Sequence, residues 1–207
     1  MNHQAQAWRS LRALSLLLVL SLGVAAFAQQ QATLGGRIEA LGDLPETARV
    51  GIHIIDGEGS TLAEIASVRP VAGTFSLSTT VPQASEMQAF STGQVLLPGL
   101  QNEYQVTPAD VQFVRAIAKV YDDSNNNGRF DNPELDPVYL GVASVEDPVG
   151  FFVMLYVDQA ATLTGRGQTL EMAAGWNVFT VRFPEEGTAL YGMDAGARDA
   201  LLDIFTQ

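Results

Sequence analysis

Residues 112–121 form a segment that is apolar on both faces when it is extended. Side chains alternate between the two faces of a strand, and only Arg115 and Lys119 interrupt the pattern with charge. The apolar positions are Phe113, Val114, Ala116, Ile117, Ala118, Val120 and Tyr121. A strand with two apolar faces must be covered on both sides. The segment is therefore predicted to lie centrally in a sheet, and the run 151–157 is predicted to be a second buried strand.

Several further short strands are indicated, separated by residues that favour turns. Asp56-Gly57 is a dipeptide suited to a tight hairpin. The remaining predicted strands are 32–41, 49–55, 61–68, 74–79, 138–142, 160–164, 169–173 and 177–183. About ten short strands at this spacing predict an all-β fold, an antiparallel β-sandwich.

The end of the chain has helical spacing. Asp199 and Asp203 would point outward from a helix whose other face is apolar. The apolar positions are Ala197, Leu201, Ile204 and Phe205. A short C-terminal helix is therefore predicted after the strands. Residues 29–207 are predicted to form one sandwich domain, with a division near 84–104 into two smaller domains, 29–83 and 104–207, as the alternative.

The first 28 residues resemble a secretory signal peptide. Arg9 and Arg12 precede the apolar run 14–25, and Ala26-Phe27-Ala28 is a small-x-small cleavage site. The sequence predicts cleavage before Gln29, no membrane insertion afterwards, and a secreted, periplasmic or cell-envelope location. A retained signal anchor is the alternative. The chain has no cysteine, which excludes disulfides and lipid attachment through cysteine.

The strongest chemical signal is the segment 123–134, Asp-Ser-Asn-Asn-Asn-Gly-Arg-Phe-Asp-Asn-Pro-Glu. It fits a twelve-residue calcium loop, with Gly128 at the sharp turn in position 6. The predicted ligands are Asp123, Asn125, Asn127, the backbone carbonyl of Arg129, Asp131 and Glu134. Calcium takes six to eight oxygen ligands, whereas magnesium demands a tight octahedron and keeps its waters, so calcium is the predicted ion.

The flanks of the loop differ from those of an EF-hand. A strand precedes the loop, and Pro133 and Pro137 disfavour a regular exiting helix. The loop is therefore expected to connect two strands. Without a helix, either Glu134 or Asp136 is able to supply the last ligand. A polar hairpin tip without metal is the simpler alternative, but the crowded carboxylates should repel one another unless a cation lies among them.

Composition argues against several other functions. The net charge of −12 disfavours nucleic acid and anionic lipid as partners. No nucleophile elbow, zinc-protease motif or phosphate-binding loop is present. His53 lies within an apolar strand and is expected to be packed, and Trp176 is expected in the core rather than as an exposed sugar platform. The protein is therefore predicted not to be an enzyme, with a carbohydrate-active or other secreted hydrolase, or an accessory sugar-binding module, as the alternative.

Two stretches resemble known families. Gly35-Gly36-Arg37-Ile38, the strand 48–55 and Gly73-Thr74-Phe75-Ser76-Leu77 resemble carboxypeptidase-regulatory or prealbumin-like β-sandwich modules over residues 32–79. The D-x-N-x-N-G-x-x-D-x-x-E string resembles calcium loops in β-sandwich repeats of bacterial surface proteins, which implies the same ligands. The whole chain is similar to uncharacterised exported envelope proteins of high-GC bacteria. These resemblances imply a structural, adhesive or ligand-binding role, with an envelope protein or a polysaccharide as partner.

Overall fold

The computed structural model describes residues 31–40, 43–57, 59–90, 104–139, 141–145, 150–165, 167–182, 190–193 and 199–206. The predicted signal peptide, residues 1–28, lies outside the described residues. Part of the predicted dividing segment, residues 91–103, lies outside them as well. Within the described part, no helix is long and apolar enough to cross a membrane.

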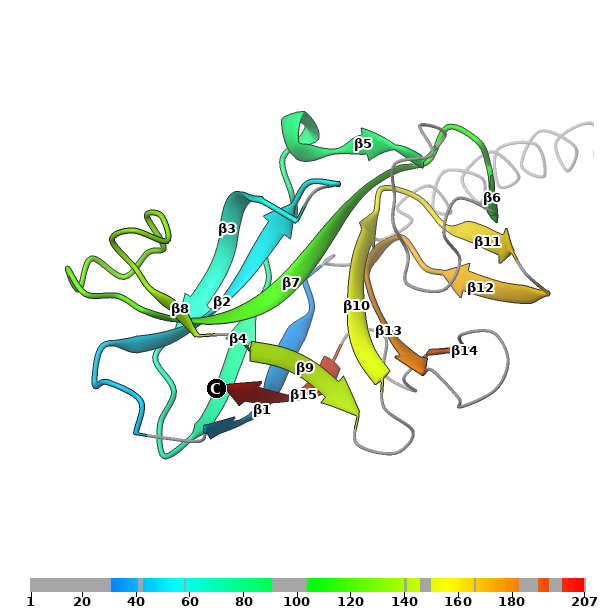
Figure 1. The fold of residues 1–207 in the computed structure, drawn as a ribbon. Helices are drawn as coiled ribbons and strands as arrows, with labels where there is room; N and C mark the ends of the chain where they lie inside the picture. Colours follow the sequence, from blue (N-terminus) through cyan, green and yellow to red (C-terminus); the bar gives the residue numbers. More distant parts are fainter. Residues whose placement is uncertain are drawn as a thin grey trace, which may run out of the picture.

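Fifteen strands and one short 3-10 helix make up the described fold (Figure 1). In chain order they are β1 (Thr33–Ala40), β2 (Ala48–Ile55), β3 (Thr61–Val68), β4 (Thr74–Ser78), η1 (Ala84–Glu86), β5 (Gln88–Ala89), β6 (Tyr104–Thr107), β7 (Gln112–Asp122), β8 (Val138–Tyr139), β9 (Gly141–Val145), β10 (Gly150–Val157), β11 (Ala161–Gly165), β12 (Gln168–Met172), β13 (Gly175–Arg182), β14 (Leu190–Met193) and β15 (Asp199–Thr206). The prediction of an all-β fold is confirmed.

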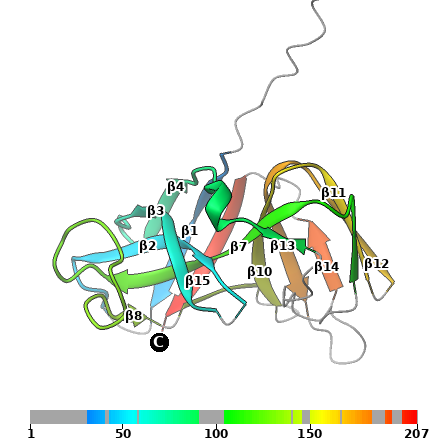
Figure 2. The same ribbon diagram turned by 90° about the horizontal axis from the view of Figure 1, so that it is seen from above.

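One large sheet runs through the molecule in the order β3-β2-β7-β10-β9-β15-β1-β4. Strands β5 and β8 pair with β7, β13 pairs with β10, and β14 pairs with β13. A separate sheet has the order β12-β11-β6. Figure 2 shows two lobes, one built from β1–β4 with β15 and the other from β10–β14, and β7 extends between them. Antiparallel pairing prevails, and β1–β15 is the parallel exception among the described strands.

Two hydrophobic cores lie on opposite faces of β7, β10 and β13. On β10, Met154 and Tyr156 belong to the first core, while Val153 and Leu155 belong to the second. The first core also contains Val50, Ile52, Ile54, Leu34, Phe75, Leu77, Val114, Ala116, Val120, Trp176 and Val178. The second also contains Phe90, Phe113, Val157, Leu163, Leu170, Met172, Phe179 and Val181. The two-faced apolar pattern of these strands is therefore satisfied by burial on both sides.

Several sequence predictions are confirmed in detail. Thr61–Val68 forms β3 with the predicted bounds, and the runs 112–121 and 151–157 lie within β7 and β10. Trp176 is buried in the first core, where its indole N–H donates to the carbonyl of Thr80 at 3.0 Å. Its burial removes it from the candidates for an exposed sugar-stacking platform. His53 is also fully buried, as expected of a packed residue.

The predicted C-terminal helix is wrong. Residues 199–206 form strand β15, which pairs in parallel with all of β1 and antiparallel with β9 at its end. These residues fit the two-residue period of a strand as well as the period of a helix, because Leu201, Asp203 and Phe205 alternate with Ala200, Leu202 and Ile204. The tertiary structure decided between the two periods, because β15 pairs with β1 along its whole length and with β9 at Ile204–Thr206.

Because β7, β10 and β13 contribute side chains to both cores, we expect the two cores to unfold together. Ile52→Ala in the first core and Phe179→Ala in the second should each lower the free energy of unfolding, by about 2–5 kcal/mol. Both residues are fully buried, whereas Thr169 is exposed, so Thr169→Ala is the matched control, expected within about 0.5 kcal/mol of the parent. Urea unfolding followed by tryptophan fluorescence and circular dichroism should give one coincident transition. Separate transitions for the two probes would show independent domains.

Candidate metal centre

The candidate metal loop connects β7 to β8. These strands pair at Val120↔Tyr139 and Tyr121↔Val138, so residues 123–137 are the tip of a hairpin. The backbone N–H of Asp122 donates to the carbonyl of Pro137 at 2.9 Å and closes the neck of this tip. The loop therefore lies between strands, as its proline-containing exit predicted.

The first half of the loop winds around the carboxylate of Asp123. This side chain is fully buried, and its oxygens accept the backbone N–H groups of Asn127 at 2.9 Å and Gly128 at 2.8 Å. Gly128 has φ +84° and Asn126 has φ +57°, the left-handed region that glycine and asparagine tolerate best. The glycine at position 6 therefore makes the reversal that the motif requires of it.

Three predicted ligand side chains meet within the loop. The amide groups of Asn125 and Asn127 both donate to Oδ2 of Asp131, at 2.7 and 2.8 Å. Oδ1 of Asn125 accepts the N–H of Asn127, and Oδ1 of Asn127 accepts the N–H of Arg129. An amide oxygen has two lone pairs, so each Oδ1 is able to keep this bond and also coordinate a cation. The arrangement gathers one carboxylate and two amides.

The structure separates the two rivals for the last ligand. Asp136 is fully buried; its Oδ2 accepts the N–H of Asp131 at 2.6 Å, and its Oδ1 has no hydrogen-bond partner among the described residues. Glu134 is exposed instead. Its position follows from Asn132, whose side chain accepts the N–H groups of Glu134 and Leu135 and forms a turn there. Asp136, rather than Glu134, is the carboxylate that the fold carries into the interior.

An unpartnered oxygen on a buried carboxylate is a sign of a missing positive charge. Leaving such an atom without a partner costs roughly 1–3 kcal/mol, and more for an ionised group. Arg49 partly balances the site, with Nη1 3.9 Å from Oδ2 of Asp123. The loop nevertheless carries four carboxylates, those of Asp123, Asp131, Glu134 and Asp136. A divalent cation would offset this surplus and supply the missing partner.

Strand β3 holds the loop against the sheet. Three side chains from this strand and the residue after it make the contacts, which join the loop near its glycine turn. The hydrogen bonds are Phe130 N–H to Oε2 of Glu64 (3.1 Å), Oγ of Ser67 to the carbonyl of Gly128 (3.1 Å), and Nη2 of Arg69 to Oδ1 of Asn126 (2.6 Å). Arg49 also donates to Oγ of Ser67, so the loop, β2 and β3 share one network. The motif gave no indication of these anchors, because they lie far from it in sequence.

The donor set consists of oxygen atoms, some on carboxylates and some on neutral amide or backbone carbonyl groups. Within the described residues, no group of three or more His, Cys, Asp or Glu side chains is placed to share one metal ion. The loop combines carboxylates with amide and backbone oxygens, which suits a hard cation such as calcium, and it contains none of the Cys or His side chains that zinc prefers.

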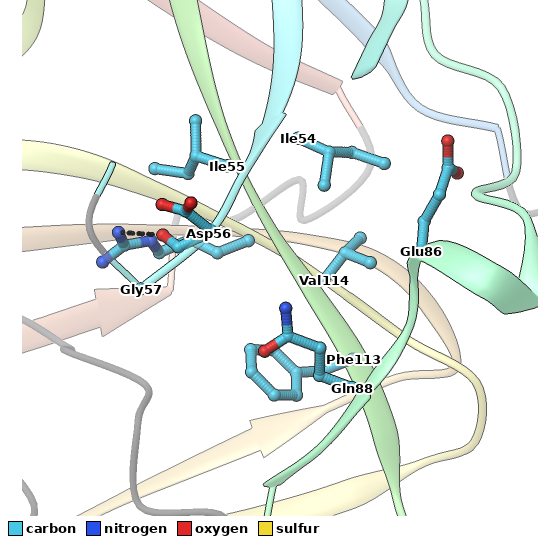
Figure 3. Close-up of a pocket in the computed structure, with 9 residues that line it drawn as sticks. Ile54, Ile55, Asp56, Gly57, Glu86, Gln88, Phe113 and Val114 are labelled. Atoms are coloured by element: carbon cyan, nitrogen blue, oxygen red, sulfur yellow. Dashed lines mark hydrogen bonds between the residues drawn. The ribbon is translucent and has the colours of Figure 1, made fainter. Parts of the chain in front are cut away.

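A separate pocket lies where β2, β5 and β7 meet (Figure 3). Nη2 of Arg115 donates to the carbonyl of Asp56 at 3.1 Å along one side. Figure 3 shows the carboxylates of Asp56 and Glu86 on opposite sides, with Ile54 and Val114 between them. The pocket therefore has one carboxylate on each side, with apolar side chains between them.

No protein-family model, curated protein or solved structure matches this chain. The geometry of the β7–β8 loop therefore supplies the functional argument.

The burial of Asp136 leads to a direct test. Asp136→Asn should weaken calcium binding by about tenfold or more, because it removes the charge at the buried position. Glu134→Gln removes the same charge from the exposed side chain two residues away, and should change the affinity by less than roughly threefold. Isothermal titration calorimetry of both variants decides the matter. A larger loss for Glu134→Gln than for Asp136→Asn would return the role to Glu134.

Proposed function

We propose that this chain is a non-enzymatic calcium-binding β-sandwich protein in which calcium stabilises the β7–β8 loop. The observation that carries the proposal is the buried carboxylate of Asp136, whose Oδ1 has no hydrogen-bond partner among the described residues. It lies in the same loop in which the amides of Asn125 and Asn127 meet the carboxylate of Asp131. The proposed ligands are Asp123, Asn125, Asn127, the carbonyl of Arg129, Asp131 and Asp136. Among the described residues the three carboxylates are not placed to share one ion, so the proposal includes a movement of the loop that draws them together when calcium binds.

The proposed ion has a structural role, which is to stabilise the loop, rather than a regulatory one. The loop is tied to β3, an edge strand of the large sheet, so ordering the loop also orders the edge. Two of the side-chain ligands are uncharged, which favours the weak extracellular class of site, with a dissociation constant on the order of 10⁻⁴–10⁻³ M. At tenfold that concentration, calcium would add about 1.4 kcal/mol to the free energy of unfolding. This is a useful fraction of the roughly 5–15 kcal/mol that stabilises a domain.

The proposed place of action is outside the cytoplasm. The charged n-region, apolar run and Ala-Phe-Ala site favour export, and millimolar extracellular calcium would keep a weak site loaded. We infer a structural, adhesive or ligand-binding module of the cell envelope, or a secreted one, with an envelope protein or polysaccharide as partner. The burial of His53 and Trp176 supports packing roles for both residues and leaves the loop as the chemically distinctive feature.

Calcium should stabilise the folded protein measurably. The melting temperature of the full chain should rise by several degrees between chelator and about 10 mM calcium, because calcium binds only the ordered loop. Asp123→Asn should abolish the rise, since Asp123 holds the first half of the loop. Asp43→Asn removes the same charge from an exposed position outside the loop and should leave the rise intact. Calorimetry without a binding signal at millimolar calcium would reject the proposal.

A further inference from the structure

A small aromatic cluster lies beneath the calcium loop. Phe130, from the loop, packs edge-on against His53 of β2 and Tyr121 of β7, with ring centroids 5.0 and 5.2 Å away. Gly51 makes room for the cluster: a Cβ there would lie 2.5 Å from Nε2 of His53 and 2.6 Å from Oε1 of Glu64. The loop therefore covers a part of the sheet that has its own packed contacts, separate from the two main cores.

The imidazole of His53 is buried in this cluster, and its ring nitrogens make no hydrogen bond to the described residues. Its side chain is fully buried, and neither ring nitrogen has a partner among the described residues. Nε2 lies 3.8 Å from Oε1 of Glu64, beyond hydrogen-bonding distance. Glu64 is engaged elsewhere, since it accepts the hydroxyl of Tyr121 at 2.8 Å and the N–H of Phe130 at 3.1 Å. A protonated imidazole would have two donors here and no acceptor in place for either.

Burial and the Lys119 ammonium favour the neutral form of His53, whereas the Glu64 carboxylate, 3.8 Å from Nε2, would attract a protonated imidazole. Burial, and then the nearby Lys119 ammonium, lower the pKa of His53 to about 3. Lys119 and Tyr121 face the cluster from β7, Glu64 faces it from β3, and Phe130 covers it from the loop, with Nζ of Lys119 5.7 Å from the Phe130 ring. Burial also raises the pKa of the Glu64 carboxyl, which weakens its ability to pair with a charged imidazole.

We propose that the loop couples calcium binding to proton binding at His53. Calcium holds the loop closed with Phe130 seated on the neutral imidazole, and protonation of His53 favours a loop with Phe130 withdrawn and calcium released. This coupling rests on the proposed calcium site. By linkage, an ion that favours the closed loop and a proton that favours the open loop must each weaken the binding of the other.

The sign of the coupling follows from the two states of His53. With Phe130 withdrawn, the imidazole meets water and its pKa approaches the ordinary value near 6.5. Between that pKa and about 3, the open state binds a proton that the closed state excludes. Falling pH therefore opens the loop, and from pH 7.5 to 5.5 the shift reaches at most about tenfold. Protonation of Glu64 acts in the opposite direction, because its raised pKa belongs to the closed state.

The imidazole signal of His53 provides the direct test. Nuclear magnetic resonance on the full chain has two histidines to distinguish, and His3→Gln assigns them. With saturating calcium, the His53 signal should not titrate between pH 7.5 and 5.5. After removal of calcium with a chelating resin, it should titrate with a midpoint raised toward 6.5. Identical titration in both states would overturn the coupling.

Calcium affinity gives a second readout and separates the two proposals. Calorimetry at pH 7.5 and 5.5 should show the affinity falling by up to about tenfold in the parent chain and by less in His53→Gln. Binding at pH 7.5 with equal pH dependence in both chains would overturn the coupling and leave the calcium site standing. Absence of binding at pH 7.5 would overturn both. If His53→Gln fails to fold, the imidazole titration alone decides, because it needs no substitution at residue 53.

Discussion

The need to cover three strands on both faces organises this fold. Strands β7, β10 and β13 have apolar side chains above and below the sheet, and exposing either face would cost about 25 cal/mol per Å² of apolar surface. Strands β1–β4 contribute the first cover and strands β11 and β12 the second. Near the start of β7, Phe113 packs in the second core. Near the end of the same strand, Tyr121 lies outside that core and packs against Phe130. The β7–β8 loop then supplies the cover, with Phe130.

The composition of the β7–β8 loop gives the physical reason for the metal ion in our proposal. Apart from Phe130 and the exposed Leu135, residues 123–136 carry few apolar side chains able to hold the loop in place. Its order depends on hydrogen bonds around Asp123 and on contacts with Glu64, Ser67 and Arg69 of the neighbouring segment. Such polar contacts contribute only about 0.5–1.5 kcal/mol each. In our proposal calcium supplies the remainder, and the seated Phe130 links the ion to the buried imidazole of His53.

The sequence predicted strand positions correctly where the hydrophobic pattern was strong. It failed where pairing with another strand determined the secondary structure. β3 has the predicted bounds, although its side chains are only partly buried. β7 and β10 contain the predicted runs, because strands that are apolar on both faces must be covered on both sides. The segment Asp199–Thr206 satisfied two periods at once, and only the positions of β1 and β9 made it a strand. The short strands β5 and β6 lack a pattern of their own and exist through their partners β7 and β11.

The sequence by itself determined the all-β class, the two-faced central strands and the spacing of the oxygen donors from Asp123 to Asp131, since these depend on local pattern and local turn chemistry. It placed Glu134 at the last ligand position, with Asp136 as the rival, because both lie within reach of the loop along the chain. Only the tertiary structure turned Glu134 outward and buried Asp136, and only it brought Phe130 onto His53 and Ser67 beneath Gly128. Those contacts join residues roughly sixty to eighty positions apart, and such pairings arise from sheet register, which no local pattern encodes.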